Sequence, residues 1–210
     1  MSGIENYSTF LITGILLNLT PGQDTMYIIG RSIAQGKKAG IASALGIGTG
    51  TIIHTIAAAF GLSAILMTSS SVYEIIKYTG AAYLFYLGMQ MILKKNIPSG
   101  IETYDEKITS ITSVYKKGIL TNVLNPKVAM FFLAFLPQFV DPSNNYGVLP
   151  FIILGLTFVI TGTLWCIVVA IFSSAFSSRL RKNLFIKNFL DKLCGILFIS
   201  LGIKLALQRK

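Results

Sequence analysis

The stretch GILLNLTPGQDTMYIIG, from Gly14 to Gly30, decides how the rest of the chain is interpreted. It is apolar enough for a membrane helix, yet it contains a Pro-Gly pair at Pro21 and Gly22 and a carboxylate at Asp24. Proline lacks a backbone N–H and clashes with the carbonyl four residues earlier. Within a bilayer, an interrupted helix and a charge are both costly unless they face protein or a water-filled cavity. The stretch therefore predicts a broken helix that borders such a cavity.

The composition of the whole chain indicates a membrane protein. Its 210 residues are 53% hydrophobic and only 12% charged, whereas soluble domains carry about 25% charged residues. Residues 147–178 contain no charged side chain, and a spanning helix needs roughly 20 apolar residues. The net charge of +10 does not indicate a nucleic-acid partner, because the cations lie in short flanks between apolar runs. No cofactor, metal site or catalytic residue is expected.

Hydropathy predicts an all-α integral membrane protein with six transmembrane helices. The expected spans are Tyr7–Gly30, Ala39–Met67, Val72–Leu93, Gly118–Val140, Gly147–Phe172 and Phe185–Leu207. A polar stretch, Asn96 to Ser110, lies near the midpoint of the chain. We therefore expect two three-helix units, residues 1–95 and 114–210, joined by a cytoplasmic linker over residues 96–113.

The distribution of Lys and Arg predicts the orientation in the membrane, because cytoplasmic loops are enriched in these residues. The first, third and fifth loops contain the cations, whereas the second and fourth contain none. The loop cations are Arg31, Lys37, Lys38, Lys94, Lys95, Lys107, Lys116, Lys117, Arg179, Arg181, Lys182 and Lys187. The N-terminus is thus expected outside a bacterial inner membrane, with the C-terminal Arg209 and Lys210 as an exception to the rule.

An internal repeat relates the two units. GILLN at residues 14–18 resembles GILTN at residues 118–122, and a proline follows each of them. KYTGAAYLFYLG at residues 77–88 likewise resembles KLCGILFISLG at residues 192–202. With three spans in each unit, the second unit must enter the membrane from the opposite side, as in many secondary transporters. Chance similarity between helices rich in Leu, Ile and Gly is the alternative.

Both predicted breaks, at Pro21-Gly22 and at Pro126, are flanked by polar side chains. Asn18 and Asp24 flank the first, and Asn122, Asn125 and Lys127 flank the second. Opposite charges deep in a bilayer fit a small zwitterionic substrate. The amine of the substrate would meet Asp24, and its carboxylate would meet Lys127. A buried pair of Asp24 and Lys127 that only orients the helices is the alternative.

Two titratable groups are candidates for proton coupling. Asp24 is the first, because export driven by inward proton flow needs a group that takes up and releases a proton. His54, the single histidine of the chain, lies in the middle of the second predicted span. It serves equally well as a packing residue or as a proton relay. Nearby, the pattern Gly46-x-Gly48-x-Gly50 indicates close helix packing.

At these residues the chain resembles the LysE/RhtB family of amino-acid exporters. The resemblance covers nearly the whole length, and its most specific part is LTNVLNPKVAMFFLAFLPQF at residues 120–139. Further matching motifs are NLTPGQDT at 18–25, GRSIAQGKKAG at 30–40 and GAAYLFYLG at 80–88. One departure is Gln23, which stands where the family usually has a second proline, so that Pro21 alone breaks the helix.

The resemblance implies export of amino acids or their derivatives from the cytoplasm by proton antiport. The matched site positions are Asn18, Pro21, Gly22 and Asp24 in the first motif, and Asn125, Pro126 and Lys127 in the second. The expected partners are a small zwitterion, protons and the lipid bilayer, with self-association into a homo-oligomer left open.

Three other functions are weaker. Export of an inorganic cation such as cadmium would favour several thiolates, whereas the chain has only Cys166 and Cys194, placed in sequence away from the proline motifs. An enzyme is not expected, because the HExxH and GxSxG motifs and paired carboxylates are missing from the sequence. A passive channel is disfavoured by the single charge beside each break.

Overall fold

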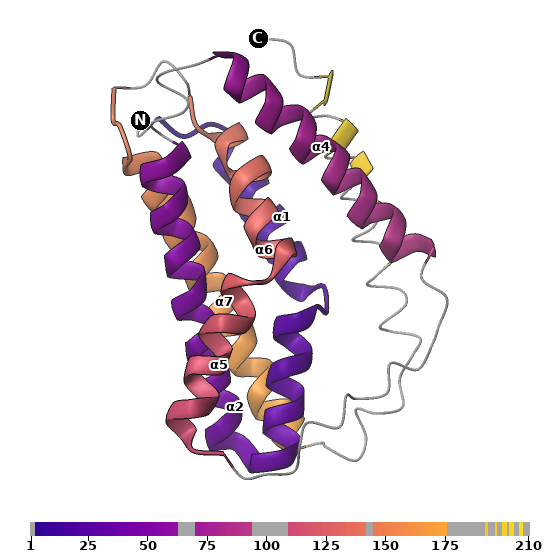
Figure 1. Cartoon of the computed structure of the whole chain (residues 1–210), viewed down its shortest axis with the longest axis vertical. Helices are drawn as coiled ribbons and strands as arrows, with labels where there is room; N and C mark the ends of the chain where they lie inside the picture. The colour runs from indigo at the N-terminus through magenta and orange to yellow at the C-terminus, as the bar shows by residue number, and fades with distance from the viewer. Residues whose placement is uncertain are drawn as a thin grey trace.

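The computed structural model describes residues 3–62, 70–93, 109–141 and 145–175, together with isolated positions near the C-terminus. These residues are helical apart from short connections and one antiparallel bridge between Ile4 and Val140. The elements are α1 (Tyr7–Leu19), α2 (Gln23–Ala57), the π-helix η1 (Ala58–Leu62), α4 (Ser70–Leu93), α5 (Ile111–Val123), α6 (Pro126–Met130), the π-helix η2 (Phe131–Phe135), the 3₁₀-helix η3 (Leu136–Phe139) and α7 (Leu149–Ala175). The fold is thus an all-helical bundle over the described residues (Figure 1).

In the described part of the chain, two helical stretches are long and apolar enough to cross a membrane, namely residues 23–61 and α7. A third candidate is the bent pair formed by α5 and the helical run from Pro126 to Phe139. α1 is apolar but short, at 13 residues. The sixth predicted span, Phe185–Leu207, lies outside the described residues except for isolated positions.

The long helix α2 reverses direction at Gly36. Its 35 residues would measure about 53 Å if they were straight, far more than the roughly 30 Å of a hydrocarbon core. Gly36 has φ 78° and ψ −175°, a conformation that only glycine adopts readily. Figure 1 shows the chain turning back at this lower end. Helix therefore continues beyond the predicted end of the first span at Gly30, and the expected loop is one sharp turn at Gly36.

The second interrupted helix is built from α5 and α6. α5 begins at Ile111, inside the stretch expected to be a linker, with Ser110 as its cap. α5 ends at Val123 and α6 begins at Pro126, and the axes of the two runs differ by 47°. After α6 the chain continues as the wider π-helix η2 and then as the narrower 3₁₀-helix η3. Such local changes of helix type often occur at functional sites.

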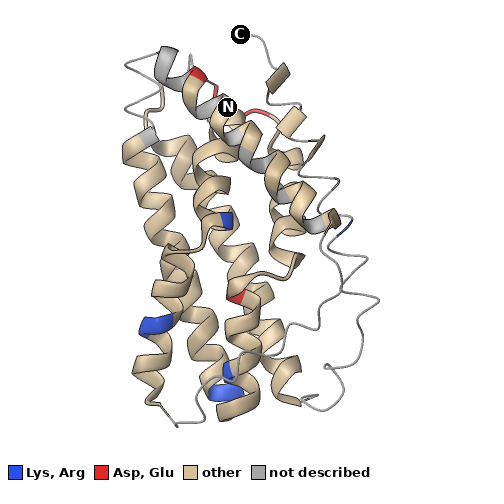
Figure 2. Cartoon of the chain, turned by 45° about the vertical axis from the view of Figure 1, so that its right-hand side comes forward, with Lys and Arg blue, Asp and Glu red and all other residues tan. Residues whose placement is uncertain are grey.

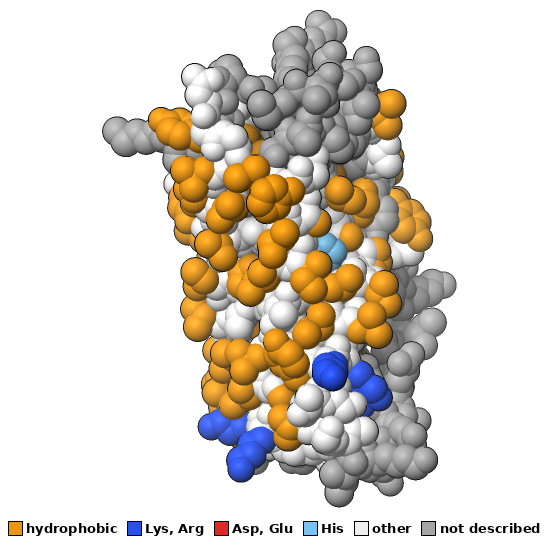
Figure 3. Space-filling view, turned by 60° about the vertical axis from the view of Figure 1, so that its left-hand side comes forward, with side chains coloured by type: hydrophobic (Ala, Val, Ile, Leu, Met, Phe, Trp, Pro, Cys, Tyr) orange, Lys and Arg blue, Asp and Glu red, His pale blue; other side chains and the backbone are white. Residues whose placement is uncertain are grey.

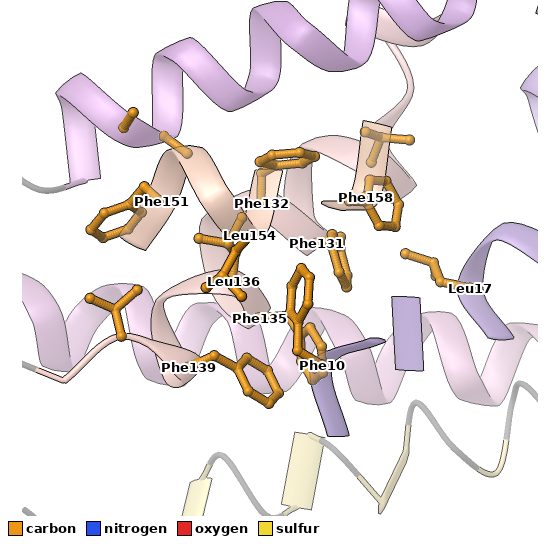
Figure 4. Packing of buried hydrophobic residues seen from close by; sticks show 14 of the residues in the cluster. Phe10, Leu17, Phe131, Phe132, Phe135, Leu136, Phe139, Phe151, Leu154 and Phe158 are labelled. Atoms are coloured by element: carbon orange, nitrogen blue, oxygen red, sulfur yellow. The ribbon is translucent and has the colours of Figure 1, made fainter. Parts of the chain in front are cut away.

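Two clusters of buried apolar side chains hold the helices together. The first, here called the phenylalanine cluster, joins α1, η2, η3 and α7. Figure 4 shows Phe10, Phe131 and Phe135 of this cluster with their rings close together. Phe131 and Phe158 stack with ring centroids 4.4 Å apart. The second cluster, here called the alanine cluster, joins α2, α5 and α7 and consists of Tyr27, Ile28, Ala39, Ala42, Ala44, Ile47, Val114 and Ala170.

Small residues let α2 and α5 approach backbone to backbone. A Cβ atom on Gly46 would lie 2.2 Å from the carbonyl oxygen of Tyr115, and one on Gly118 would lie 3.3 Å from the Cα atom of Gly46. One turn further along α2, a Cβ atom on Gly50 would lie 2.8 Å from the side chain of Asn122. Any side chain at these three glycines would push the helices apart. We call this contact the glycine seam.

Charged side chains are sparse along the bundle. Figure 2 shows Lys and Arg mainly toward one end of the molecule, with only isolated charges at mid-height. The face in Figure 3 is covered by hydrophobic side chains above a group of Lys and Arg, and the histidine lies among the hydrophobic residues. Exposed Ile52, Ile53 and Ile56 of α2 belong to the apolar surface of the protein. This surface suits lipid as the surrounding medium.

Candidate functional site: a chamber between two broken helices

A small chamber lies where the two helix interruptions meet α7. Its lining comes from α1, α2, α5, α6, α7 and the connections at the two prolines. The lining residues are Leu17, Asn18, Thr20, Gly22, Asp24, Thr25, Ile47, Gly48, Thr51, Asn122, Asn125, Lys127, Val128, Phe158, Gly162, Thr163 and Cys166. The chamber offers about 40 Å³ to the centres of water molecules, room for a few waters at about 10–15 Å³ each. The chamber is therefore small in this conformation.

The chamber separates the two apolar clusters. Leu17, Val128 and Phe158 belong to both its wall and the phenylalanine cluster, and Figure 4 shows Leu17 and Phe158 at one end of that cluster. Ile47 belongs to both the wall and the alanine cluster. Packed apolar side chains therefore lie on two sides of a polar interior.

The first interruption is held by a lysine from the second. α1 ends at Leu19 and α2 begins at Gln23. Because Pro21 has no N–H, it cannot bond to the carbonyl of Leu17, four residues earlier. Lys127 Nζ donates to Leu17 O and to Thr20 O, both at 2.8 Å. A cation is well placed at these carbonyls, since the C-terminal end of a helix carries partial negative charge.

The second interruption is held in a matching way by a histidine from α2. Pro126 cannot donate to the carbonyl of Asn122, four residues earlier. His54 Nε2 donates to this oxygen at 3.2 Å. Asn125 caps α6, because its Oδ1 accepts from the backbone N–H of Lys127 at 3.0 Å. At each break, a side chain from another helix thus reaches the carbonyl that proline leaves without its usual donor.

The Asp24 carboxylate is held by an amide of α5. Asn122 is fully buried, and its Nδ2 donates to Asp24 Oδ2 at 2.8 Å. Asn122 Oδ1 in turn accepts from Thr51 Oγ1 at 3.3 Å. The side chains of Asn125 and Lys127 are also near enough to stabilise the negative charge. The other oxygen, Asp24 Oδ1, is buried and has no hydrogen-bond partner among the described residues.

The structure brings six of the predicted site residues to one place. Asn18, Gly22, Asp24, Asn122, Asn125 and Lys127 all line the chamber. Asn18 also faces α7, where its Nδ2 donates to Thr161 Oγ1 at 3.4 Å. Pro21 and Pro126 do not line the chamber themselves, although their neighbours in sequence do. His54 contacts the backbone of Asn122, and its ring stacks on Phe132 with centroids 5.7 Å apart. The opposite charges of Asp24 and Lys127 thus face one enclosed space.

Sequence reasoning missed the contribution of α7. Phe158, Gly162 and Cys166 lie four residues apart and so share one face of this helix, with Thr163 beside them. The available signal is the run Thr161-Gly162-Thr163 within a strongly apolar helix, since small and polar residues are enriched where membrane helices pack together. A Cβ atom on Gly162 would lie 3.1 Å from the Asn18 side chain, so this glycine allows α7 to approach the first break.

One expectation about cysteine is wrong. Cys166 was placed away from the proline motifs, but it lines the same chamber as Asp24 and Lys127. The error arises because distance along the sequence says little about neighbours once α7 packs against both breaks. Cys194 lies outside the described residues. Among the described residues, no group of three His, Cys, Asp or Glu side chains is arranged to hold a metal ion.

Comparison with known proteins gives a consistent result. The profile of the LysE type translocators matches residues 15–209. A leucine efflux protein of Salmonella typhimurium is 29% identical over 207 residues, covering 97% of this chain and 96% of that protein. An uncharacterized membrane protein of Bacillus subtilis, YrhP, is 30% identical over 200 residues, covering 92% and 94%. No solved structure matches the chain.

Proposed function

Because this chain belongs to the family of LysE type translocators, we propose that it exports an amino acid or amino-acid derivative from the cytoplasm in exchange for protons. The observation that carries the proposal is the chamber in which Asp24 and Lys127 face one enclosed space between two broken helices. The similarity to leucine efflux proteins supports an amino-acid substrate. We place the protein in the inner membrane of a bacterium, with its N-terminus outside.

In this proposal the two charges bind the two ends of a zwitterion. The ammonium group of the substrate binds at Asp24, whose Oδ1 has no donor among the described residues. The carboxylate binds at Lys127, which turns from the carbonyls of Leu17 and Thr20 toward the substrate. Asn18, Asn122 and Asn125 supply further polar contacts, since their side chains line the same space.

We further propose that the two broken helices are equivalent parts of an inverted repeat. The similarity of GILLN and GILTN supports this, as does the exchange of contacts in which Lys127 serves the first break and His54 the second. Alternating access then consists of separating one apolar cluster while the other stays packed around the substrate site. Because the chamber is small, it must widen during this cycle to take an amino acid.

Proton coupling is assigned to Asp24. When the Asp24 carboxylate is charged, it binds the ammonium group of the substrate. When it is protonated, it releases that group. The same residue therefore binds either the substrate or a proton, which is the requirement for exchange. His54 is assigned a structural role at the second break, because its Nε2 already donates to the carbonyl of Asn122.

Vesicles that contain the purified protein test the proposal directly. They are loaded with an equimolar mixture of the twenty standard amino acids, and efflux is measured by mass spectrometry with the outside made acidic. We expect at least one amino acid to leave faster than from protein-free vesicles, and the excess to disappear when a protonophore removes the gradient. Efflux that equals that of protein-free vesicles for every amino acid would refute the proposal. Selective efflux of cadmium from parallel vesicles would instead support cation export.

A further inference from the structure

The hydroxyl group of Thr163 has an unusual environment for a threonine within a helix. Such a hydroxyl ordinarily donates to the carbonyl four residues earlier. Thr157 and Thr161, on the same helix, do so at 2.9 Å each. Thr163 Oγ1, in contrast, is buried and has no hydrogen-bond partner among the described residues. A buried hydroxyl left in this state is costly, so the structure contains a polar atom with unused capacity.

Thr163 is one of the residues that line the chamber. Thr163 Oγ1 faces Gly48 of α2, where a Cβ atom would approach it to 2.5 Å, so the missing side chain at Gly48 makes room for it. Thr163 and Gly48 both line the space that Asp24 enters from the start of α2. Cys166, one turn along α7 from Thr163, lies within electrostatic range of both Asp24 and Lys127. Asp24 and Thr163 therefore both line one small chamber, and each has a buried oxygen, Oδ1 and Oγ1 respectively, without a hydrogen-bond partner in the described part of the chain.

The remaining walls are apolar. Leu17, Ile47, Val128 and Phe158 line the chamber, and none of their side chains offers a hydrogen bond. A second charged group on the substrate would need a further partner of opposite charge, and Asp24 and Lys127 are the only charged residues among those that line the described chamber. The walls thus suit the aliphatic side chain of a neutral amino acid.

We infer that the chamber takes a neutral aliphatic amino acid and that Thr163 is the positioning residue that holds its α-ammonium group against Asp24. An ammonium group has three N–H donors, so Asp24 Oδ1 and Thr163 Oγ1 satisfy two of them while the apolar walls contact the side chain. This inference rests on the proposed export function, and it adds the substrate class and a residue of α7 to the site.

The test compares Thr163→Val, which keeps the shape but removes the hydroxyl, with Thr163→Ser, which keeps the hydroxyl. Thr157→Val is the matched control, because Thr157 lies on α7 outside the chamber. The purified proteins are reconstituted in vesicles, and the concentration of L-leucine that gives half-maximal exchange is measured. Inhibition by 4-methylpentanoate, which has the same side chain and carboxylate but no amine, is measured in parallel.

We expect Thr163→Val to raise the half-maximal concentration of L-leucine by about 10-fold or more, the loss of one hydrogen bond from a charged donor. Thr163→Ser and Thr157→Val are expected within about 3-fold of the unaltered protein, and inhibition by 4-methylpentanoate unchanged. Equal L-leucine values in Thr163→Val and the unaltered protein would overturn the role of Thr163, as would equal weakening of L-leucine and 4-methylpentanoate. If the unaltered protein exports another amino acid from the mixture but neither binds nor exchanges L-leucine, the substrate class is overturned while the export function stands.

Discussion

The replacement Lys127→Met tests whether the lysine of the second break holds the first one together. Lys127 Nζ donates two hydrogen bonds of 2.8 Å, to Leu17 O and Thr20 O. A hydrogen bond that involves a charged group contributes about 1.5–3 kcal/mol in soluble proteins, whereas interhelical hydrogen bonds in membranes average about 0.6 kcal/mol. Leu17 O keeps the backbone N–H of Thr20 at 3.2 Å when the ammonium is removed. We therefore expect the free energy of unfolding to fall by about 1–3 kcal/mol.

The assay is thermal unfolding of the purified protein in one detergent at one heating rate. For a chain of this size, 1 kcal/mol lowers the Tm by about 2–4 °C, so Lys127→Met should lower it by about 2–12 °C. The control is Lys117→Met, the same replacement at an exposed lysine of α5, which should leave the Tm within about 1 °C. The reasoning fails if the two variants unfold at the same temperature, because the contacts to α1 would then contribute nothing to stability.

Replacements at Asp24 and His54, a transport measurement on Lys127→Met and a labelling experiment test the other parts of the proposal. Asp24→Asn keeps the shape and an oxygen that accepts from Asn122, so we expect a folded protein whose efflux no longer responds to an imposed pH gradient; a normal response would remove Asp24 from the coupling role. His54→Leu should lower the Tm by about 1–6 °C, whereas His54→Gln, which still offers a donor to the Asn122 carbonyl, should lower it less; the reverse order would contradict the role of His54 at the second break. Lys127→Met should reduce export of an amino acid more than export of its carboxamide, and equal effects on both would exclude Lys127 as the carboxylate partner. Cysteine labels on intact cells should react from outside at the N-terminus and only after permeabilisation at residues 96–113, and the opposite accessibility would refute the predicted orientation.

Local rules in the sequence predict the two interruptions and their charges well. A proline without an N–H disturbs a helix wherever it lies, so the boundaries at Pro21 and Pro126 follow from residue type alone. The cost of an isolated charge in a bilayer predicts that Asp24 faces protein or a water-filled cavity, but it does not identify the partner. These arguments need no knowledge of how the helices pack, which is why they succeed before a structure is known.

The partners across the chamber could not be predicted in the same way. α7 is strongly apolar along most of its length, so the short run Thr161-Gly162-Thr163 is a weak indication of which face turns toward the protein interior. For that reason Thr163 and Gly162 were not singled out and Cys166 was expected elsewhere, although all three line the chamber. The turn at Gly36 lies within the loop expected between Gly30 and Ala39, but the helix on both sides of it was not expected, because the Lys and Arg around it indicate a loop and a helix end equally well. The contacts of Lys127 with α1 depend on an approach of two segments that are distant in the sequence.

The glycine seam has a consequence for how selectivity can change. Because α2 meets α5 through bare backbone at Gly46 and Gly118, the spacing of those helices is set by atoms that no rotamer can adjust. Asn122, which orients Asp24, lies one turn beyond this contact and moves with it. We expect a methyl group added at Gly46 to push α5 away and so to move the Asn122 amide away from the Asp24 carboxylate. The replacement would then change the site without touching it. If the proposed export function is right, a replacement in the glycine seam should change selectivity without altering a residue that contacts the substrate.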